Sequence, residues 1–172
     1  VAVNEGEQYE RLCANGIRNP SCIIGEKPRE GKFDFLVFGD SHARSLLPVI
    51  DTIASQAGLS GTSATLPACP PLFGTQRKDL APIYVAECRN FHDGVVAFLN
   101  EQPQLRTVIL SARWALYSNG PSGPYNGKQH ELMIHRTDIE KPIQSSDSFF
   151  ESGLKNTVNE LNSRGIRVII VG

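Results

Sequence analysis

The sequence predicts an α/β protein in which a central parallel sheet is covered by helices on both faces. Three observations support this fold class. Segments with the length and apolar content of buried strands alternate with segments that repeat apolar residues at helical spacing. The strand segments are almost entirely apolar, as in sheets covered on both sides. The 172 residues, 40% of them hydrophobic, suffice for one domain with a substantial core.

The first strand and helix are expected on either side of a polar turn. Residues 1–32 are polar and irregular, with a turn or two of helix around residues 7–12, and we expect them to be an N-terminal extension or linker. Residues 33–38 form an almost continuous apolar run and predict a buried strand. Residues 43–57 repeat apolar side chains at helical spacing, and Gly58 is expected to end this helix.

The middle of the sequence predicts another strand, helix and strand. Residues 59–66 are a plausible second strand, followed by a proline-rich loop. Residues 81–100 predict a helix, because Pro82 is tolerated in a first turn and apolar residues recur at helical spacing. Residues 106–112 predict the third strand.

The last third of the sequence begins without apolar periodicity, and regular elements are predicted again from residue 148. Residues 113–147 are rich in turn residues and long for a connection, so we expect them to be functional or mobile. Ser148 and Glu151 have the spacing of a capping box, which predicts a helix over residues 148–163. Residues 166–171 predict a fourth strand. Because a strand in an alternating fold leads into another helix, we expect the domain to be truncated at its C-terminus.

Composition and charge exclude several classes of partner. The formal net charge is −1 and no basic stripe is present, so neither nucleic acid nor an anionic membrane surface is an expected partner. No apolar run approaches the roughly 20 residues that cross a bilayer, and the N-terminus has no signal-peptide pattern. We therefore expect a soluble domain with a small-molecule or carbohydrate partner, which a longer secreted or membrane-anchored protein could contain.

The four cysteines allow three disulfide pairings. They do not have the paired C-x-x-C spacing of zinc sites, so we expect no metal. They fall into two couples that are local in sequence, Cys13 with Cys22 and Cys69 with Cys88, and each couple brackets a loop rich in turn residues. This pattern favours two disulfides and an oxidising compartment, with four reduced buried cysteines as the alternative.

The stretch GDSH at residues 39–42 lies between the first predicted strand and its helix. In open parallel sheets, ligands bind outside the carboxyl ends of the strands, so the Ser41 hydroxyl is expected in that crevice. The Ser41 backbone N–H, at a helix start, could donate to a developing oxyanion. Asp40 and Ser41 are also common helix N-cap residues, so capping alone would account for the turn. The turn lacks the glycine spacing of a nucleotide-binding loop.

The wider stretch FLVFGDSHARSLLPVI, residues 35–50, resembles block one of the SGNH (GDSL-type) hydrolase superfamily, in which the serine of Gly-Asp-Ser is the nucleophile. The histidine after the serine, the local cysteine couples, and the ACPPLFG and SARWALY stretches make the chain most similar to one group. These are the periplasmic SGNH domains fused to acyltransferase-three membrane proteins, which O-acylate bacterial surface polysaccharides such as O-antigen. The resemblance covers residues 33–172 and implies a flavodoxin-like, three-layer αβα sandwich.

The resemblance also implies roles for individual residues. Ser41 matches the nucleophile, and Asp40 matches the acid beside it. Arg113 stands where the family has its oxyanion-hole asparagine, so Arg113 or backbone amides are the candidate oxyanion donors. Residues 66–69 occupy the place of the second-block glycine, which has no match. The family's base lies in an Asp-x-x-His block, and no Asp here has a His three residues later, so we expect the catalytic His and Asp to be absent from this chain.

The histidines of this chain are weak candidates for the base. His42 is adjacent to Ser41, but neighbouring side chains at a helix start diverge, so we expect His42 to cap the helix or line the site. His92 lies in a predicted helix, and His130 and His135 lie in the irregular segment. We expect these three to be surface residues.

Two aromatic residues and one arginine follow the third predicted strand. Trp114 and Tyr117 lie at the rim where a sugar could stack, although an aromatic there is more often part of the core. Arg113 could contact a substrate carboxylate or phosphate, or cap carbonyl groups. We take Arg113, Trp114 and His42 as candidates for substrate or oxyanion contacts.

The resemblance implies an SGNH-type acyl-ester domain of a bacterial envelope O-acyltransferase, in which Ser41 carries the acyl group as an acyl-serine to a sugar hydroxyl. The expected partners are an acylated donor, a polysaccharide acceptor and a membrane acyltransferase domain in the same chain, with no cofactor. The expected location is the periplasm, tethered to the inner membrane. Two alternatives are open: a secreted carbohydrate esterase that removes acetyl groups, and a non-catalytic glycan-binding module with this fold.

Overall fold

The structure is a computed structural model that describes residues 13, 17, 22–77, 79–118, 134–135 and 146–172. The helical turn predicted at residues 7–12 and His130 lie outside the described residues, as does most of the turn-rich segment after residue 118. None of the described helices has the length and hydropathy of a membrane-spanning segment.

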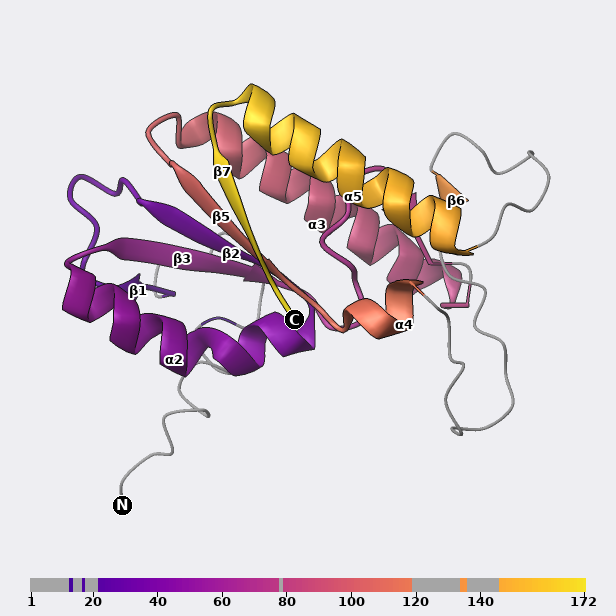
Figure 1. Cartoon of the computed structure of the whole chain (residues 1–172), viewed down its shortest axis with the longest axis horizontal. Coiled ribbons are helices and arrows are strands. Elements are labelled where there is room, and N and C mark those ends of the chain that lie inside the picture. Colours follow the sequence, from indigo (N-terminus) through magenta and orange to yellow (C-terminus); the bar gives the residue numbers. More distant parts are fainter. Residues whose placement is uncertain (1–12, 14–16, 18–21, 78, 119–133, 136–145) are drawn as a thin grey trace, which may run out of the picture.

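A five-stranded sheet in the order β1-β3-β2-β5-β7 forms the middle layer (Figure 1). Its strands are β1 (Ile24–Gly25), β2 (Phe35–Gly39), β3 (Ser60–Thr65), β5 (Thr107–Ser111) and β7 (Arg167–Val171). All neighbouring pairs are parallel except β1 with β3, which is antiparallel. Gly39, the last residue of β2, pairs with Thr65 on one side and Ser111 on the other, so three carboxyl ends meet at one edge.

Helices cover both faces of this sheet (Figure 1). On one face lies α2 (Ser41–Ala57), and on the other lie α3 (Pro82–Glu101) and α5 (Ser146–Ser163). A short helix, α4 (Trp114–Ser118), follows β5, and a separate pair of strands joins β4 (Thr75–Gln76) to β6 (Ile134–His135). The predicted α/β class and its layers of helix, sheet and helix are confirmed.

The apolar sequence of β2 follows from its place at the centre of the sheet. Successive side chains of a strand point to opposite faces. Phe35 and Val37 accordingly pack in the cluster that includes α2, whereas Leu36 and Phe38 pack in the cluster that includes α3 and α5. Because both faces are covered, all four side chains are at least 95% buried.

Helix α2 begins and ends at residues that the backbone requires. It starts two residues before the predicted position, because Asp40 caps it: the Asp40 side chain accepts a hydrogen bond from the His42 backbone N–H. It ends at Gly58, as predicted, where φ is +66° and the glycine N–H bonds back to carbonyl groups of the last turn.

The segment expected to be a linker contributes to the domain wherever the structure describes it. Ile24 is fully buried, and β1 extends the sheet beyond β3. The Gly25 N–H donates to Asp51 of α2 at 2.6 Å, and the Thr62 hydroxyl donates to the Cys22 carbonyl at 2.8 Å. The strand of this segment, β1, therefore forms one edge of the sheet.

The start of α5 differs from the predicted capping box. The helix begins at Ser146, so Ser148 lies inside it. The Glu151 carboxylate accepts a hydrogen bond from Lys155, one turn later, at 2.6 Å. This pair is an exposed ion pair along the helix, of the kind that contributes little to stability.

Both expected disulfides are present. Cys13 is bonded to Cys22 and Cys69 to Cys88, which uses all four cysteines. The second disulfide joins the loop after β3 to α3, close to the carboxyl edge of the sheet. Each bond restricts the unfolded chain and so favours the folded state.

The two faces of the sheet are covered unequally. On the side of α2, an apolar groove of about 390 Å³ runs beside β5 and β7. Ile53, Leu59 and Ile169 line this groove and are 61%, 44% and 40% exposed. No described residue covers these side chains more fully, whereas Val108 and Leu110 on the opposite face of β5 are fully buried.

Candidate active site

The candidate nucleophile lies on the turn between the central strand and its helix. Ser41 is the first residue of α2, two positions after the last residue of β2. Gly39 is required here, because a Cβ atom at this position would collide with the Ser111 carbonyl oxygen and the Ala43 side chain. Glycine therefore allows the turn to approach β5 closely.

The Ser41 side chain is accessible. Ser41 is exposed, and its hydroxyl makes no hydrogen bond with any described residue. Its carbonyl oxygen accepts a hydrogen bond from the Ser45 hydroxyl at 2.9 Å, so the backbone of this first turn is held. The first N–H groups of a helix lack partners within the helix. The Ser41 N–H, at the start of α2, is therefore a candidate donor to an anion.

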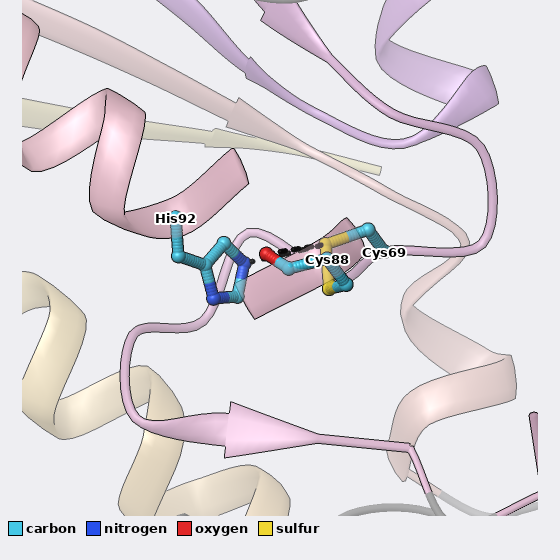
Figure 2. Close-up of side chains that lie close together, drawn as sticks. All are labelled: Cys69, Cys88 and His92. Atoms are coloured by element: carbon cyan, nitrogen blue, oxygen red, sulfur yellow. Dashed lines mark hydrogen bonds between the residues drawn. A yellow bond between two sulfur atoms is a disulfide. The ribbon is translucent and has the colours of Figure 1, made fainter. Parts of the chain in front are cut away.

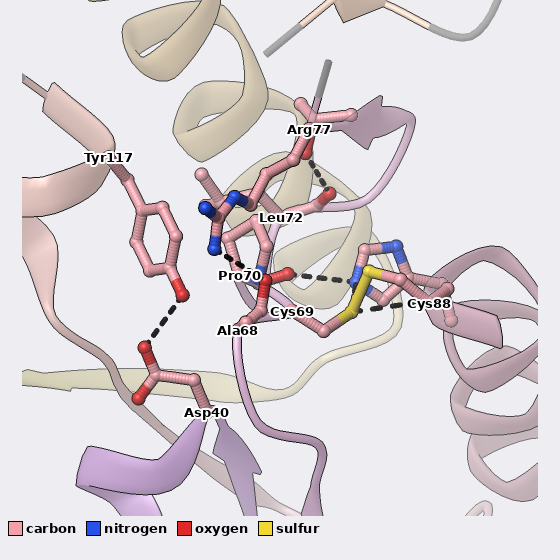
Figure 3. Close-up of a disulfide and its surroundings, with 10 residues drawn as sticks. Asp40, Ala68, Cys69, Pro70, Leu72, Arg77, Cys88 and Tyr117 are labelled. Atoms are coloured by element: carbon pink, nitrogen blue, oxygen red, sulfur yellow. Dashed lines mark hydrogen bonds between the residues drawn. A yellow bond between two sulfur atoms is a disulfide. The ribbon is translucent and has the colours of Figure 1, made fainter. Parts of the chain in front are cut away.

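Asp40 is buried and joins two loops at this edge. Its side chain is 3% exposed. One carboxylate oxygen, Oδ1, accepts from the His42 backbone N–H at 2.8 Å. The other, Oδ2, accepts from the Arg113 backbone N–H at 3.0 Å. It also accepts from the Tyr117 hydroxyl at 2.7 Å (Figure 3). These contacts fasten the loop after β5 to the turn that carries Ser41.

His42 stays beside the carboxylate that caps its own backbone. The ring Nδ1 lies 3.5 Å from Asp40 Oδ1, and the side chain is 54% exposed. No contact joins the ring to the Ser41 hydroxyl among the described residues. The geometry thus agrees with the expected divergence of the two side chains at the helix start.

Tyr117 is buried, not at a rim where a sugar could stack. Its side chain is fully buried and packs with Leu72 and Ala112. Burial, together with the neighbouring Asp40 carboxylate, holds the pKa of Tyr117 well above its ordinary value. The phenol therefore stays protonated and donates a hydrogen bond to the Asp40 carboxylate. No sequence pattern indicates this contact, because the two residues are 77 positions apart.

Trp114 makes the contacts of a core residue. Its indole Nε1 donates to the Val171 carbonyl oxygen at 2.8 Å, and its ring lies edge-on to Phe150 with centroids 6.1 Å apart. The side chain is half-buried. Trp114 thus links α4 to the end of β7 and to α5, in line with the core role that the sequence left open.

Arg113 presents its side chain and its backbone to different partners. The backbone N–H is used by Asp40, so this amide is not available to an oxyanion. The side chain is exposed at the edge of the sheet that carries Ser41. Of the Arg113 backbone amide and the Arg113 guanidinium, only the guanidinium therefore remains available as a donor to an oxyanion.

The loop after β3 forms a neighbouring wall of this edge. Its first residue, Leu66, donates its backbone N–H to the Gly39 carbonyl at 3.0 Å. The Ala68 carbonyl accepts from the buried Arg77 guanidinium at 3.3 Å (Figure 3). Arg77 is also paired with Asp79. The disulfide from Cys69 holds the same loop to α3.

His92 is buried, and the prediction of a surface position is wrong. Its Nε2 lies 2.8 Å from the Pro70 carbonyl oxygen. The same nitrogen lies 3.4 Å from the Cys69 sulfur (Figure 2). Its ring meets those of Phe38 and Phe73 edge-on. Although Cys69, Cys88 and His92 place three potential metal ligands within 4.8 Å of one another, the two sulfurs are bonded to each other. The cluster is therefore a disulfide with a packed histidine.

His135 is described only through its backbone, which lies in β6 and pairs with Thr75. No described histidine lies within hydrogen-bond distance of the Ser41 hydroxyl. The described site thus contains an accessible serine, a buried carboxylate that fixes its turn, and an exposed arginine in the loop after β5.

A largely parallel α/β sheet with Gly-Asp-Ser between its central strand and the following helix is the arrangement expected of a protein of the SGNH-hydrolase type. The family model for the SGNH domain fused to AT3 domains matches residues 7–172. The chain belongs to this family. The match includes most of the segment that the sequence analysis set apart as an extension.

One similar solved structure is the periplasmic domain of a lipopolysaccharide acetyltransferase of Salmonella ser. Paratyphi A. The TM-score is 0.56 and the sequence identity 16%, so the likeness shows the fold. The alignment covers 99% of this chain and 59% of that structure, so this chain spans about three fifths of its length. A comparison with curated proteins gives no match.

Proposed function

We propose that this chain is the SGNH domain of an envelope O-acetyltransferase, in which Ser41 accepts an acetyl group and passes it to a hydroxyl of a surface polysaccharide. One observation carries the proposal: the Ser41 hydroxyl is exposed at the carboxyl edge of the sheet, on a turn that the buried Asp40 fixes. Membership of the family fused to AT3 domains supports transfer, as does the likeness to a lipopolysaccharide acetyltransferase domain.

The reaction has two steps. In the first, Ser41 Oγ attacks the acyl carbonyl carbon, its proton passes to a base, and the donor's leaving group departs with the electron pair of the broken bond. In the second, a sugar hydroxyl attacks the acyl-serine, which forms the sugar ester and returns the hydroxyl to Ser41. The negative charge on the carbonyl oxygen would be stabilised by the Ser41 N–H and the Arg113 guanidinium.

The role of Asp40 in this proposal is to position Ser41. Both carboxylate oxygens already accept hydrogen bonds from within the fold. A carboxylate engaged in this way caps the helix and orders the loop, and it has no contact with the Ser41 hydroxyl. We assign the proton transfer to a histidine paired with an acid that lie outside the described residues.

Membership of the family fused to AT3 domains supports a proposal for the domain arrangement. We propose that a membrane acyltransferase domain in the same polypeptide delivers the acyl group. The SGNH domain would face the periplasm and transfer the group there to the polysaccharide acceptor. The two disulfides support an oxidising compartment.

One observation favours the alternative of a glycan-binding module without catalysis. The Arg113 N–H is occupied by Asp40, which leaves fewer backbone donors for an oxyanion. In this alternative the edge of the sheet would bind a sugar chain, and Ser41 would act only as part of the helix start.

The test compares serine variants of the intact protein that carries this domain, expressed in cells that lack their own copy. Surface polysaccharide is purified and its O-acetyl content measured by NMR. We expect Ser41→Ala to reduce acetylation to the background of cells without the protein. Ser55→Ala, which changes an exposed serine near the other end of α2, should leave it unchanged.

Three outcomes separate the alternatives. Undiminished acetylation with Ser41→Ala would contradict the proposal and favour a binding module. An acetyl content that rises when Ser41 is replaced would show that the protein removes acetyl groups, as an esterase does. A loss specific to Ser41→Ala supports transfer through this serine.

A further inference from the structure

We propose that Tyr117 is a positioning residue of this site: through Asp40, its hydroxyl holds the Arg113 loop against the turn that carries Ser41. The inference rests on the proposed function of Ser41. It adds a residue that the family motif at residues 39–42 does not contain and that lies on a different element, α4.

The Asp40 carboxylate divides its two oxygens between two tasks. Oδ1 accepts from the His42 N–H, and this contact alone satisfies the start of α2. Oδ2 takes no part in this cap and accepts from the Arg113 N–H and the Tyr117 hydroxyl. A helix cap would not need the second oxygen to be paired, so the two donors on Oδ2 serve the connection to the loop after β5.

The Tyr117 hydroxyl is well suited to hold this oxygen in place. At 2.7 Å it makes the shortest of the three contacts to Asp40, and its ring is fully buried. A buried hydroxyl without a hydrogen-bond partner would lower the stability of the fold. The hydrogen bond therefore fixes the Tyr117 ring and the Asp40 carboxylate relative to each other. The raised pKa of Tyr117 means that the phenol donates throughout the physiological range of pH.

The position of Oδ2 in turn fixes the Arg113 backbone and so the point from which the Arg113 side chain extends. The Arg113 N–H is 3.0 Å from Oδ2, and the Arg113 side chain extends into solvent from the same residue. If Tyr117 no longer held the carboxylate, Oδ2 would retain only the amide contact and the loop could shift. Small displacements of a donor from the reacting oxygen are enough to reduce transition-state stabilisation strongly.

The first test removes only the hydroxyl. In the intact protein, hydrolysis of p-nitrophenyl acetate is followed for wild type, Tyr117→Phe and Tyr84→Phe, well below the unfolding temperature. We expect Tyr117→Phe to lower kcat about tenfold with KM changed less than about twofold, because the lost interaction acts on the transition state. Tyr84 is 57% exposed at the start of α3, so Tyr84→Phe is the matched control and should stay within about twofold of wild type.

The second test asks whether Tyr117 acts through Asp40. Asp40→Asn replaces the accepting oxygens with an amide, and Tyr117→Phe is then repeated in this background. We expect the further change in kcat to be less than about twofold, because the partner of the hydroxyl is gone. If the two effects multiply instead, Tyr117 acts independently and the inference is wrong.

A third measurement does not depend on activity. Hydrogen–deuterium exchange of the peptide over residues 111–116 is followed by mass spectrometry. We expect the Arg113 amide to exchange about tenfold faster in Tyr117→Phe and no faster in Tyr84→Phe. If Tyr117→Phe does not fold, 4-aminophenylalanine in place of Tyr117, which restores a donor on the ring, should restore the wild-type exchange rate.

The outcomes distinguish this inference from the proposed function. Turnover that survives Ser41→Ala would overturn the proposed function. Turnover that requires Ser41, combined with unchanged kcat and unchanged exchange in Tyr117→Phe, would overturn only the role of Tyr117. A wild-type exchange rate of the Arg113 amide in a variant whose ring has no hydrogen-bond donor would also contradict this role. The shape of the ring alone would then hold the loop.

Discussion

At the carboxyl edge of the sheet, polar groups are buried and paired, whereas beside β5 and β7 apolar side chains are exposed. Asp40 is 2% exposed and accepts three hydrogen bonds. Ile53 and Ile169, on the α2 side, are 61% and 40% exposed although their residue type is usually buried. The polar edge is thus organised within the described residues, while the apolar groove is not closed by them.

The same contrast appears within neighbouring strands. Leu110 of β5 is fully buried against the helices on one face, and Ile169 of β7 borders the groove on the other. Two aliphatic side chains in adjacent strands are thus expected to contribute very differently to stability. Substitutions at the two faces and at the polar edge test how far this difference extends.

The largest expected effect is the loss of a side chain from the closed face. Leu110→Ala should lower the free energy of unfolding by about 4 kcal/mol, because it opens a cavity in a packed core. Ile169→Ala should cost less than about 1 kcal/mol, since its side chain is already partly in water. Urea unfolding followed by circular dichroism, with the disulfides intact, measures both. Equal costs would mean that the groove is covered in solution.

The next effect concerns the polar edge. Asp40→Ala removes the cap of α2 and leaves two further donors without a partner, so we expect a cost of about 3 kcal/mol. Asp51, on the same helix, accepts one backbone N–H from Gly25. Asp51→Ala should therefore cost about 1 kcal/mol. If both variants unfold at the same urea concentration, the network around Asp40 contributes no more than a single hydrogen bond.

A smaller effect should depend on pH. An unfolded tyrosine has a pKa of about 10, and that of Tyr117 in the folded protein lies well above this value. As pH rises above about 10, the unfolded chain loses this proton first, so the stabilisation is full below that pH and decreases above it, by at most about 1.4 kcal/mol per pH unit.

Unfolding between pH 8 and 11 checks this dependence. Tyr117→Phe should reduce the loss of stability above pH 10, and Tyr84→Phe, at an exposed site, should not. A profile that is the same in wild type and Tyr117→Phe would show that the phenol is not held in its neutral form by the fold.

The smallest effect is expected for a polar substitution in the groove. Ile53→Ser should change the free energy of unfolding by less than about 0.5 kcal/mol, because the side chain is already 61% exposed. Urea unfolding again measures the change. A cost of more than about 2 kcal/mol would show that Ile53 is buried in solution.

How much of this could be predicted from the sequence depends on how local each feature is. The strand, turn and helix around Ser41 are set by consecutive residues, and their pattern predicts them. The contact of Tyr117 with Asp40 joins residues far apart in the chain, and no periodicity indicates it. The local signal is the spacing of four residues from Arg113 to Tyr117, about one helical turn, which places Tyr117 in α4 one turn after Arg113.

His92 and β3 show where residue type misleads. His92 was predicted at the surface because of its polarity, yet it lies four residues after Cys88 and three before Val95, on the buried face of α3. β3 has the sequence SGTSAT, which lacks large apolar residues, yet every position is buried. Its place between β1 and β2, with the Thr62 hydroxyl bonded to the Cys22 carbonyl, accounts for this burial.

The most direct test of the account is to trap the acyl group on Ser41. The intact protein is mixed with p-nitrophenyl acetate, quenched in acid and digested, and the peptide that contains Ser41 is examined by mass spectrometry. We predict one acetyl group on Ser41 in wild type and none at this position in Ser41→Ala. Acetyl transfer to the polysaccharide that continues undiminished in Ser41→Ala would contradict the central claim.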